Sequence, residues 1–166
     1  MKKAFTLIEL IFVIVIIGVL ASVAIPKFKN LTTHAKSSGV KSVVTSVQSS
    51  IDNIHGKWII NDSFSWDPDG DGDNDLNNEG YPEILDSNTT SEDKLFKYVL
   101  KVPVPACAAG KTNGCWREEP EGGKYRYYYD ASNYLQLEYN ATSGTLQCAS
   151  GGGKYSDVSK CEKVVY

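Results

Sequence analysis

Residues 4–25 read AFTLIELIFVIVIIGVLASVAI, and this stretch decides both the fold and the class of protein. From Leu10 to Ile25 the only polar side chain is that of Ser22. Together with the apolar residues before it, the run has roughly the 20 residues that a helix needs to cross the ~30 Å hydrocarbon core of a bilayer. The sequence therefore predicts a membrane-spanning helix over residues 5–25.

Charged residues before and inside this run predict its orientation and distinguish it from an ordinary signal peptide. Lys2 and Lys3 precede the run and predict a cytoplasmic N-terminus, so the rest of the chain faces the periplasm or the exterior. Glu9 lies inside the apolar block, where a carboxylate costs about 2.5–3.5 kcal/mol at the centre of a bilayer. An ordinary secretory signal peptide is the alternative interpretation, but a leader that is removed has no reason to carry such an acid.

The string from Ala4 to Leu10 resembles the class III leader of type IV pilins and type II secretion pseudopilins. In that family a prepilin peptidase cuts before the Phe and methylates the new amine, which implies processing between Ala4 and Phe5. The family usually has Gly before the cut, and Ala4 is also small enough for the peptidase. The invariant Glu of the family falls on Glu9. The resemblance covers only the N-terminal segment, and beyond it the likeness is one of architecture.

The resemblance implies a helical filament of many copies, with residues 5–25 in its core. After cleavage Phe5 would carry a cationic amine, and Glu9 would lie one turn further along the same helix face. In a stack of staggered subunits Glu9 can neutralise the amine of a neighbouring copy, and a paired buried charge costs far less than an unpaired one. The family also implies prepilin peptidase, an inner-membrane assembly platform and minor pilins or pseudopilins as partners.

A second helical pattern follows the apolar run. Pro26 removes one helical hydrogen bond and predicts a kink. Beyond Gly39, apolar residues recur at the i, i+3, i+4, i+7 spacing of an amphipathic helix. These residues are Val40, Val43, Val44, Val47, Ile51, Ile54 and Trp58. We expect one long helix from Phe5 to Ile59, softly broken at Pro26 and Gly39, with one apolar stripe in its second half.

The C-terminal part of the chain predicts β-strands. Residues 124–130 and 133–139 each alternate between two faces and enclose a short turn, which is typical of a hairpin. Residues 145–148 and 162–166 are candidates for one or two further strands. The expected fold is α+β and type IV pilin-like, with one long N-terminal helix packed on a small antiparallel β-sheet.

Five segments follow from these patterns. A prepilin leader occupies residues 1–4, and a transmembrane or filament-core helix occupies residues 5–25. The amphipathic helix of the head spans residues 26–60, and an acidic loop region spans residues 61–123. The antiparallel sheet and a C-terminal disulfide loop occupy residues 124–166.

An acidic, glycine-rich loop lies between the predicted helix and the predicted sheet. Residues 67–75 read DPDGDGDND, and no Lys or Arg occurs between Lys57 and Lys94. Alternate aspartates in such a loop present several hard oxygen atoms to one point, which suits Ca²⁺ with its about 6–8 oxygen ligands. The candidate ligands are Asp67, Asp69, Asp71, Asp73, Asp75 and Glu79.

The spacing of this loop follows the first part of an EF-hand loop. Its first three aspartates take positions 1, 3 and 5, and Gly72 takes the turn position. Asn78 stands where a bidentate Glu closes an EF-hand, so Glu79, Glu83 or a backbone carbonyl is left to close the site. The loop is also similar to thrombospondin type 3 and dockerin repeats, and many major pseudopilins use Ca²⁺ in their heads. A solvated acidic loop without an ion is the alternative.

Four cysteines lie in the part of the chain expected outside the cytoplasm, where disulfides persist. They are Cys107, Cys115, Cys148 and Cys161. Four cysteines allow three connectivities. We favour nearest-neighbour pairing, which closes two short loops, and a Cys148–Cys161 bond resembles the C-terminal disulfide loop of type IV pilins. Neither pair has CxxC spacing, which argues against thiol redox chemistry and zinc binding.

Composition narrows the function classes further. The chain has 166 residues, a net charge of -3 and a pI near 5.4, which argues against nucleic-acid binding by bulk charge. Its two histidines, His34 and His55, stand singly and are expected to be solvated or capping side chains. The sequence contains no catalytic constellation and no phosphate loop, so we predict no enzymatic activity.

The preferred function is a structural subunit of a type IV pilus-like filament with a calcium-binding loop in its head. A pseudopilin of a type II secretion system is the alternative, and a membrane-anchored, exported calcium-binding domain ranks below it. The C-terminal disulfide loop favours the pilus, whereas the acidic loop favours the pseudopilus. The expected location is the bacterial inner membrane before assembly, and a surface pilus or periplasmic pseudopilus afterwards.

Overall fold

The computed structural model describes residues 6–61, 63–86, 94–120 and 122–166. In chain order the assigned elements are α1 (Leu7–Ile60), β1 (Lys94–Leu95), β2 (Val104–Pro105), β3 (Cys115–Glu118), β4 (Lys124–Tyr128), β5 (Tyr134–Asn140), β6 (Thr145–Gly152), the 3-10 helix η1 (Gly153–Tyr155) and α2 (Val158–Val165). The expected leader over residues 1–4, and Phe5 after it, lie outside the described residues.

The chain divides into two compact units, Met1–Lys36 and Ser37–Tyr166, and α1 contributes to both. In the first unit the apolar side chains of α1 are exposed, and the helix is long and apolar enough to cross a membrane. Helix α1 is continuous through Pro26 and Gly39, so neither residue ends the helix. One proline removes a single hydrogen bond, and the turns on either side keep theirs.

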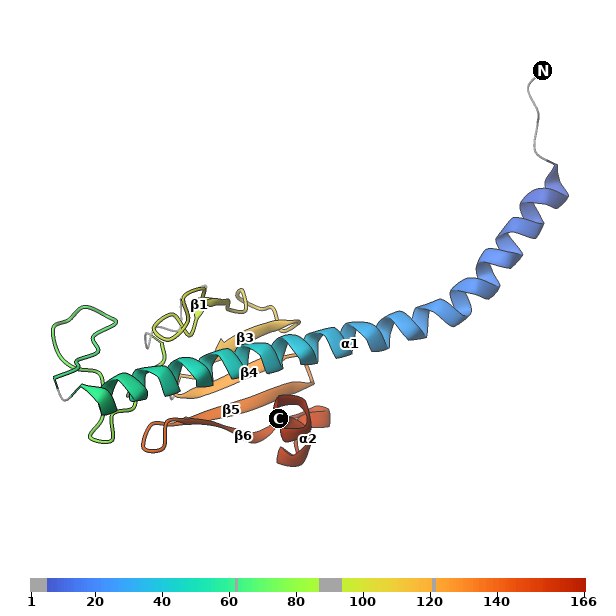
Figure 1. Cartoon of the computed structure of the whole chain (residues 1–166). Helices are drawn as coiled ribbons and strands as arrows, with labels where there is room; N and C mark the ends of the chain where they lie inside the picture. Colours follow the sequence, from blue (N-terminus) through green and yellow to red (C-terminus); the bar gives the residue numbers. More distant parts are fainter. Residues whose placement is uncertain (1–5, 62, 87–93, 121) are drawn as a thin grey trace, which may run out of the picture. The chain divides into compact units, whose positions relative to one another are not determined.

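The second unit, which we call the head, has its core between one stripe of α1 and one face of an antiparallel sheet, as Figure 1 shows. The helix contributes Val40, Val44, Val47, Ile51 and Ile54, all buried and all at positions that the periodicity predicts. Each fully buried aliphatic side chain of this kind contributes about 1.5–3 kcal/mol to the stability of the fold.

The sheet has the strand order β3-β4-β5-β6, and all neighbouring strands are antiparallel. The predicted hairpin is β4 and β5, with Tyr127 opposite Leu135 and Tyr125 opposite Leu137. These four side chains are buried in the core that α1 covers. The α+β, pilin-like fold predicted from the sequence is therefore confirmed.

Some segments differ from the sequence-based expectation. Strands β1, β2 and β3 lie inside the range 61–123 that was expected to be loop: β1 pairs with β2 in a small antiparallel sheet, and β3 forms one edge of the larger sheet by pairing with β4. Residues 162–166, proposed as a strand, belong mostly to helix α2. The side chain of Asp157 caps α2 by accepting a hydrogen bond of 3.0 Å from the Ser159 N–H. Cys161 and Val165 share one helix face and are buried together, which favours the helix.

Candidate functional site

The acidic loop follows the C-terminal end of α1 and is closed at its base by backbone hydrogen bonds. The N–H of Asp75 donates to the carbonyl of Trp66 at 2.8 Å, and the N–H of Glu83 donates to the carbonyl of Asp75 at 2.8 Å. The Trp66 N–H in turn donates to the side-chain oxygen of Asn74 at 3.0 Å. These contacts bring both ends of the aspartate run together, so the run forms a compact loop.

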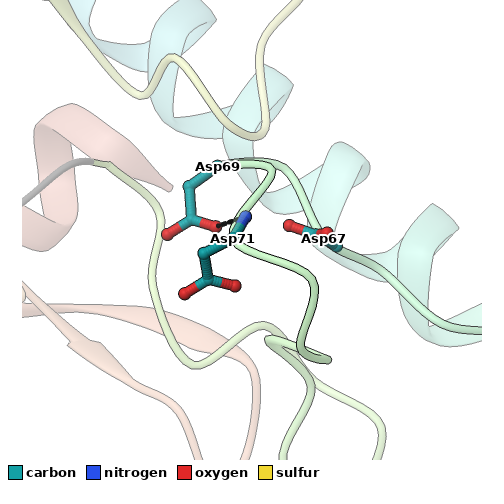
Figure 2. A group of neighbouring side chains, drawn as sticks. All are labelled: Asp67, Asp69 and Asp71. Carbon is teal, nitrogen blue, oxygen red and sulfur yellow. Dashed lines mark hydrogen bonds between the residues drawn. The ribbon is translucent and has the colours of Figure 1, made fainter.

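Three of the predicted ligands come together inside this loop. One carboxylate oxygen each from Asp67, Asp69 and Asp71 lies within 4.8 Å of the other two, and all three side chains are exposed. Figure 2 shows the three carboxylates around one region of the loop. Such a group of hard oxygen atoms can hold a divalent cation, and Ca²⁺ suits its donor set.

The backbone winds around the first of these carboxylates. The two oxygens of Asp67 accept hydrogen bonds from the N–H groups of Gly70 at 2.7 Å and Gly72 at 3.1 Å. Both glycines have positive φ values, of 81° and 100°. Residues with a Cβ avoid this region of backbone space, which explains why glycine alternates with aspartate in this loop.

The other three predicted ligands lie outside the group of three. A hydrogen bond with the Asp71 side chain, and then the negative charge of Asp71, raise the pKa of Asp73 above the ordinary value of 3.8. Burial, and then the charge of Asp69, raise the pKa of Asp75 in the same direction. Its Oδ2 atom is buried and has no hydrogen-bond partner among the described residues. Glu79 is exposed, and its N–H donates to the side chain of Asn77 at 3.1 Å.

A cluster of aromatic rings packs the segment around Gly80 and Tyr81 against α1. The ring of His55 stacks on Tyr81 at a centroid distance of 4.0 Å and lies 5.7 Å from the ring of Trp58. Its Nδ1 atom lies 3.3 Å from the carbonyl oxygen of Gly80. His55 is therefore half-buried and holds the loop against the helix, whereas the sequence predicted a solvated or capping residue.

Asn77 fixes the same segment to the sheet. Its side-chain N–H donates to the carbonyl of Ala141 in the β5–β6 turn at 2.7 Å, and its side-chain oxygen accepts from the N–H of Tyr81 at 2.9 Å. No sequence pattern identified Asn77 as a positioning residue. An Asn followed three residues later by Gly80 is a turn signal, but the contact with the sheet depends on tertiary structure.

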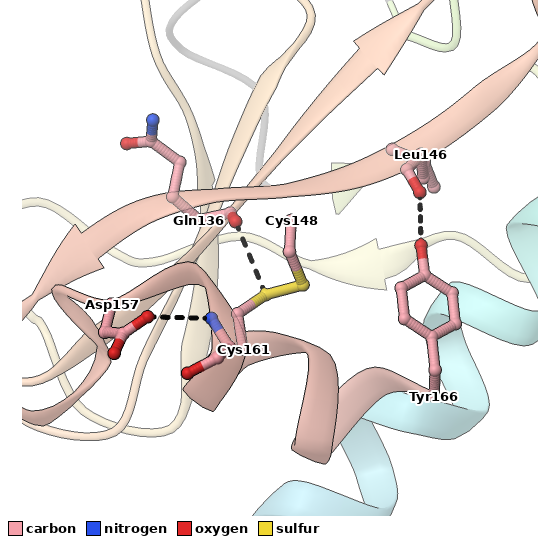
Figure 3. Close-up of a disulfide and its surroundings, with 7 residues drawn as sticks. Gln136, Leu146, Cys148, Asp157, Cys161 and Tyr166 are labelled. Carbon is pink, nitrogen blue, oxygen red and sulfur yellow. Dashed lines mark hydrogen bonds between the residues drawn. A yellow bond between two sulfur atoms is a disulfide. The ribbon is translucent and has the colours of Figure 1, made fainter.

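Two disulfides stabilise the head. Cys107 bonds to Cys115 across eight residues, and Cys148 bonds to Cys161 across 13 residues. This is the nearest-neighbour pairing that the sequence favoured. The second bond fastens α2 to β6, and the Tyr166 hydroxyl beside it donates to the carbonyl of Leu146 at 2.6 Å (Figure 3).

The candidate assembly residue lies in the first unit. The Glu9 N–H donates to the Thr6 hydroxyl at 3.3 Å, in the first turn of the described helix, and the Glu9 side chain is exposed. Ala4 and Phe5, where processing and methylation are predicted, lie outside the described residues.

Comparison with known proteins agrees with this arrangement. Residues 1–25 match the model of the prokaryotic N-terminal methylation motif. The chain is 41% identical over 70 residues to the type IV major pilin protein PilE1 of Neisseria gonorrhoeae, a match covering 38% of this chain and 40% of the pilin. It is 49% identical over 47 residues to the type IV narrow pilus major component PilA5 of Thermus thermophilus, covering 28% and 40%.

A fimbrial protein of Pseudomonas aeruginosa is 36% identical over 61 residues, a match that covers 36% of this chain and 40% of the relative. The chain thus spans about two fifths of the length of the curated relatives that it matches. No solved structure gives a significant match.

Proposed function

We propose that this chain is a major subunit of a type IV pilus, a structural protein and not an enzyme, because its N-terminal part matches the methylation motif and is similar to type IV major pilins. The observation that carries the proposal is the N-terminal methylation motif over residues 1–25, continuous with one helix that reaches into a pilin-like head. Prepilin peptidase would cut between Ala4 and Phe5 and methylate the amine of Phe5.

Assembly would then depend on the exposed apolar surface of α1. Among the described residues of the first unit this surface is exposed, and in a filament neighbouring copies would cover it in place of the membrane lipid. Glu9 would pair with the amine of Phe5 on a neighbouring copy and fix the register of the stack. Other partners would be the inner-membrane assembly platform and minor pilins. The subunit would lie in the inner membrane before assembly and on the cell surface after it.

The first experiment determines the N-terminus of the mature protein from its native host, by sequencing and by mass. The proposal expects a chain that begins at N-methylated Phe5. Retention of Met1, or cleavage between Ala21 and Ala24 as in a signal peptide, would reject it and leave an anchored or secreted domain.

A second experiment tests the role of Glu9 in assembly. Glu9→Val should sharply lower the yield of sheared filaments without lowering the amount of subunit in the membrane. Ser22→Val is the matched control, because it removes the one polar side chain between Leu10 and Ile25 and should leave the yield unchanged. Equal yields from the two variants would contradict the proposed role of Glu9.

The acidic loop supports a second candidate function, that of a pseudopilin in a type II secretion system. The two functions differ in where the polymer lies, since a pilus extends from the cell and a pseudopilus stays in the periplasm. Electron microscopy of wild-type and deletion strains separates them. Long surface fibres that disappear on deletion support the pilus, and loss of a secreted protein without loss of fibres supports the pseudopilus.

We propose further that the loop binds Ca²⁺ through Asp67, Asp69 and Asp71. Two observations support a bound cation: the three carboxylates lie within reach of one ion, and the buried Oδ2 of Asp75 has no hydrogen-bond partner among the described residues. Burial and then the neighbouring aspartate charges raise the pKa of Asp75, and a cation would neutralise those charges. Its role would be structural, because the loop is fastened to both α1 and the sheet.

Thermal unfolding of the full chain in detergent tests the calcium site. Bound Ca²⁺ at 100 times its Kd would stabilise the head by about 2.7 kcal/mol, and a chelator should remove this gain. Asp69→Ala/Asp71→Ala should abolish the response, whereas the control Asp52→Ala, which removes an exposed acid from α1, should keep it. Indifference of the wild-type protein to both Ca²⁺ and chelator would leave the loop as a solvated acidic segment.

A further inference from the structure

Two arginines lie directly opposite each other on the outer face of the sheet. Arg117 of β3 pairs with Arg126 of β4, and Arg126 pairs with Gln136 of β5. Cross-strand partners share a face, and the alternate residues Tyr125 and Tyr127 belong to the core beneath α1. The arginines therefore point away from α1. Like charges directly opposite each other destabilise a sheet unless something compensates them.

Among the described residues, Arg126 has an ion-pair partner and Arg117 does not. Arg126 forms an ion pair with Glu119 at 2.9 Å, and its Nε donates to the side chain of Gln136 at 2.7 Å. Arg117 has no carboxylate at ion-pair distance within the described ranges, and its one polar contact is a 3.4 Å bond to the carbonyl of Lys111. Arg117 thus keeps a partly exposed positive charge with N–H donors to spare.

Tyrosine rings hold both guanidinium groups in place. Arg117 lies 5.2 Å from the ring centroid of Tyr128, Arg126 lies 4.7 Å from that of Tyr134, and the two rings are 5.2 Å apart. We call these four residues the Arg–Tyr cluster. Arg and Tyr are enriched among residues that dominate binding energy, and side chains that are already ordered lose little entropy on binding.

The acidic loop of the same molecule cannot reach this cluster easily. The loop is fastened to the turn that follows β5, through Asn77 on Ala141, whereas the cluster lies in the rows of Tyr134 and Gln136 toward the other end of β5. Figure 1 likewise shows the loop beside the C-terminal end of α1, beyond the end of the sheet. A contact between the two surfaces therefore joins different copies of the chain.

We infer that the Arg–Tyr cluster binds the acidic loop of a second copy of this chain, with Arg117 as the central contact. Charge complementarity selects this occupant, because residues 67–75 carry five aspartates and keep a negative charge even with one divalent cation bound. Two different surfaces of each subunit meet in such a contact, which is heterologous and repeats along an open helix. The inference rests on the proposed filament and adds a contact between heads to the packing of α1.

Charge reversal in the full chain tests the contact in the native host. The yield of sheared filaments, normalised to subunit in the membrane, should fall at least about fivefold in Arg117→Glu, because like charges then oppose each other. Lys101→Glu makes the same change at an exposed residue outside the cluster and should stay near wild type. Adding Asp73→Arg to Arg117→Glu places an opposite charge within reach of the new Glu and should restore part of the yield, and that partial rescue excludes misfolding as the cause of the loss.

The outcomes separate this inference from the proposed function. Normal filaments in Arg117→Glu, or no rescue by Asp73→Arg, would overturn the contact while leaving the filament intact. If Arg117→Glu forms normal filaments that no longer bind an anionic polysaccharide, the contact between copies would also be overturned, and the cluster would be assigned to a foreign ligand. Absence of filaments from the wild type would overturn both proposals.

Discussion

Gly80→Ala tests whether the acidic loop is held to α1 by direct packing. Gly80 has a φ of 78°, and a Cβ added there would lie 2.2 Å from Cδ2 of Trp58 and 2.3 Å from its Cε3. The left-handed backbone alone costs an alanine about 1–2 kcal/mol. Displacing a packed ring costs typically a further 1–3 kcal/mol. We therefore expect Gly80→Ala to lower the free energy of unfolding by about 2–5 kcal/mol.

Gly110→Ala is the matched control. Gly110 has a similar φ of 74°, and nothing lies within 4 Å of an added Cβ. It should lose only the backbone part, about 1–2 kcal/mol, so the difference between the two variants measures the contact with Trp58. Denaturant unfolding of the full chain in detergent, followed by tryptophan fluorescence, reports on the head, because all three tryptophans lie after residue 37.

A double-mutant cycle completes this test. In a Trp58→Ala background, Gly80→Ala should cost no more than Gly110→Ala, because the ring that it displaces has been removed. Equal effects of the two glycine variants in the wild-type background would refute the packing contact between Gly80 and Trp58. The same holds if the effect of Gly80→Ala persists undiminished without the ring.

Three further predictions concern the core and the sheet. Cys148→Ala/Cys161→Ala should lower the free energy of unfolding by about 3 kcal/mol, measured under oxidising conditions, because it opens a loop whose ends are 13 residues apart; no loss would show that α2 docks without the bond. Burial, and then the charge of Asp86, raise the pKa of Glu118 above 4.5, so stability falls as the pH rises through the raised pKa. Glu118→Gln should therefore raise the melting temperature at pH 7 but not at pH 4, and equal shifts at both would contradict this. Ile51→Ala should cost about 2–5 kcal/mol, whereas Asn53→Ala on the exposed side of α1 should be close to neutral.

The sequence alone determined the long helix, the central hairpin and the aspartate group. The helix follows from a continuous apolar run and then a 3.6-residue period, and the hairpin follows from a two-residue period on both sides of a turn. The loop follows from aspartates that alternate with glycines. In each case residues close together in the chain are also close together in space, so their spacing in the sequence is enough to predict the local structure.

Tertiary structure decided the features that depend on residues far apart in the chain. Strand β3 is only four residues long, and it becomes a strand because β4 offers it an edge. His55 meets Tyr81 only when the loop folds back on α1. Arg117 faces Arg126 only in one register of β3 against β4, and a slip of one residue would turn Arg117 into the core. Local patterns cannot specify such pairs, because packing of the whole head sets the register and the docking together.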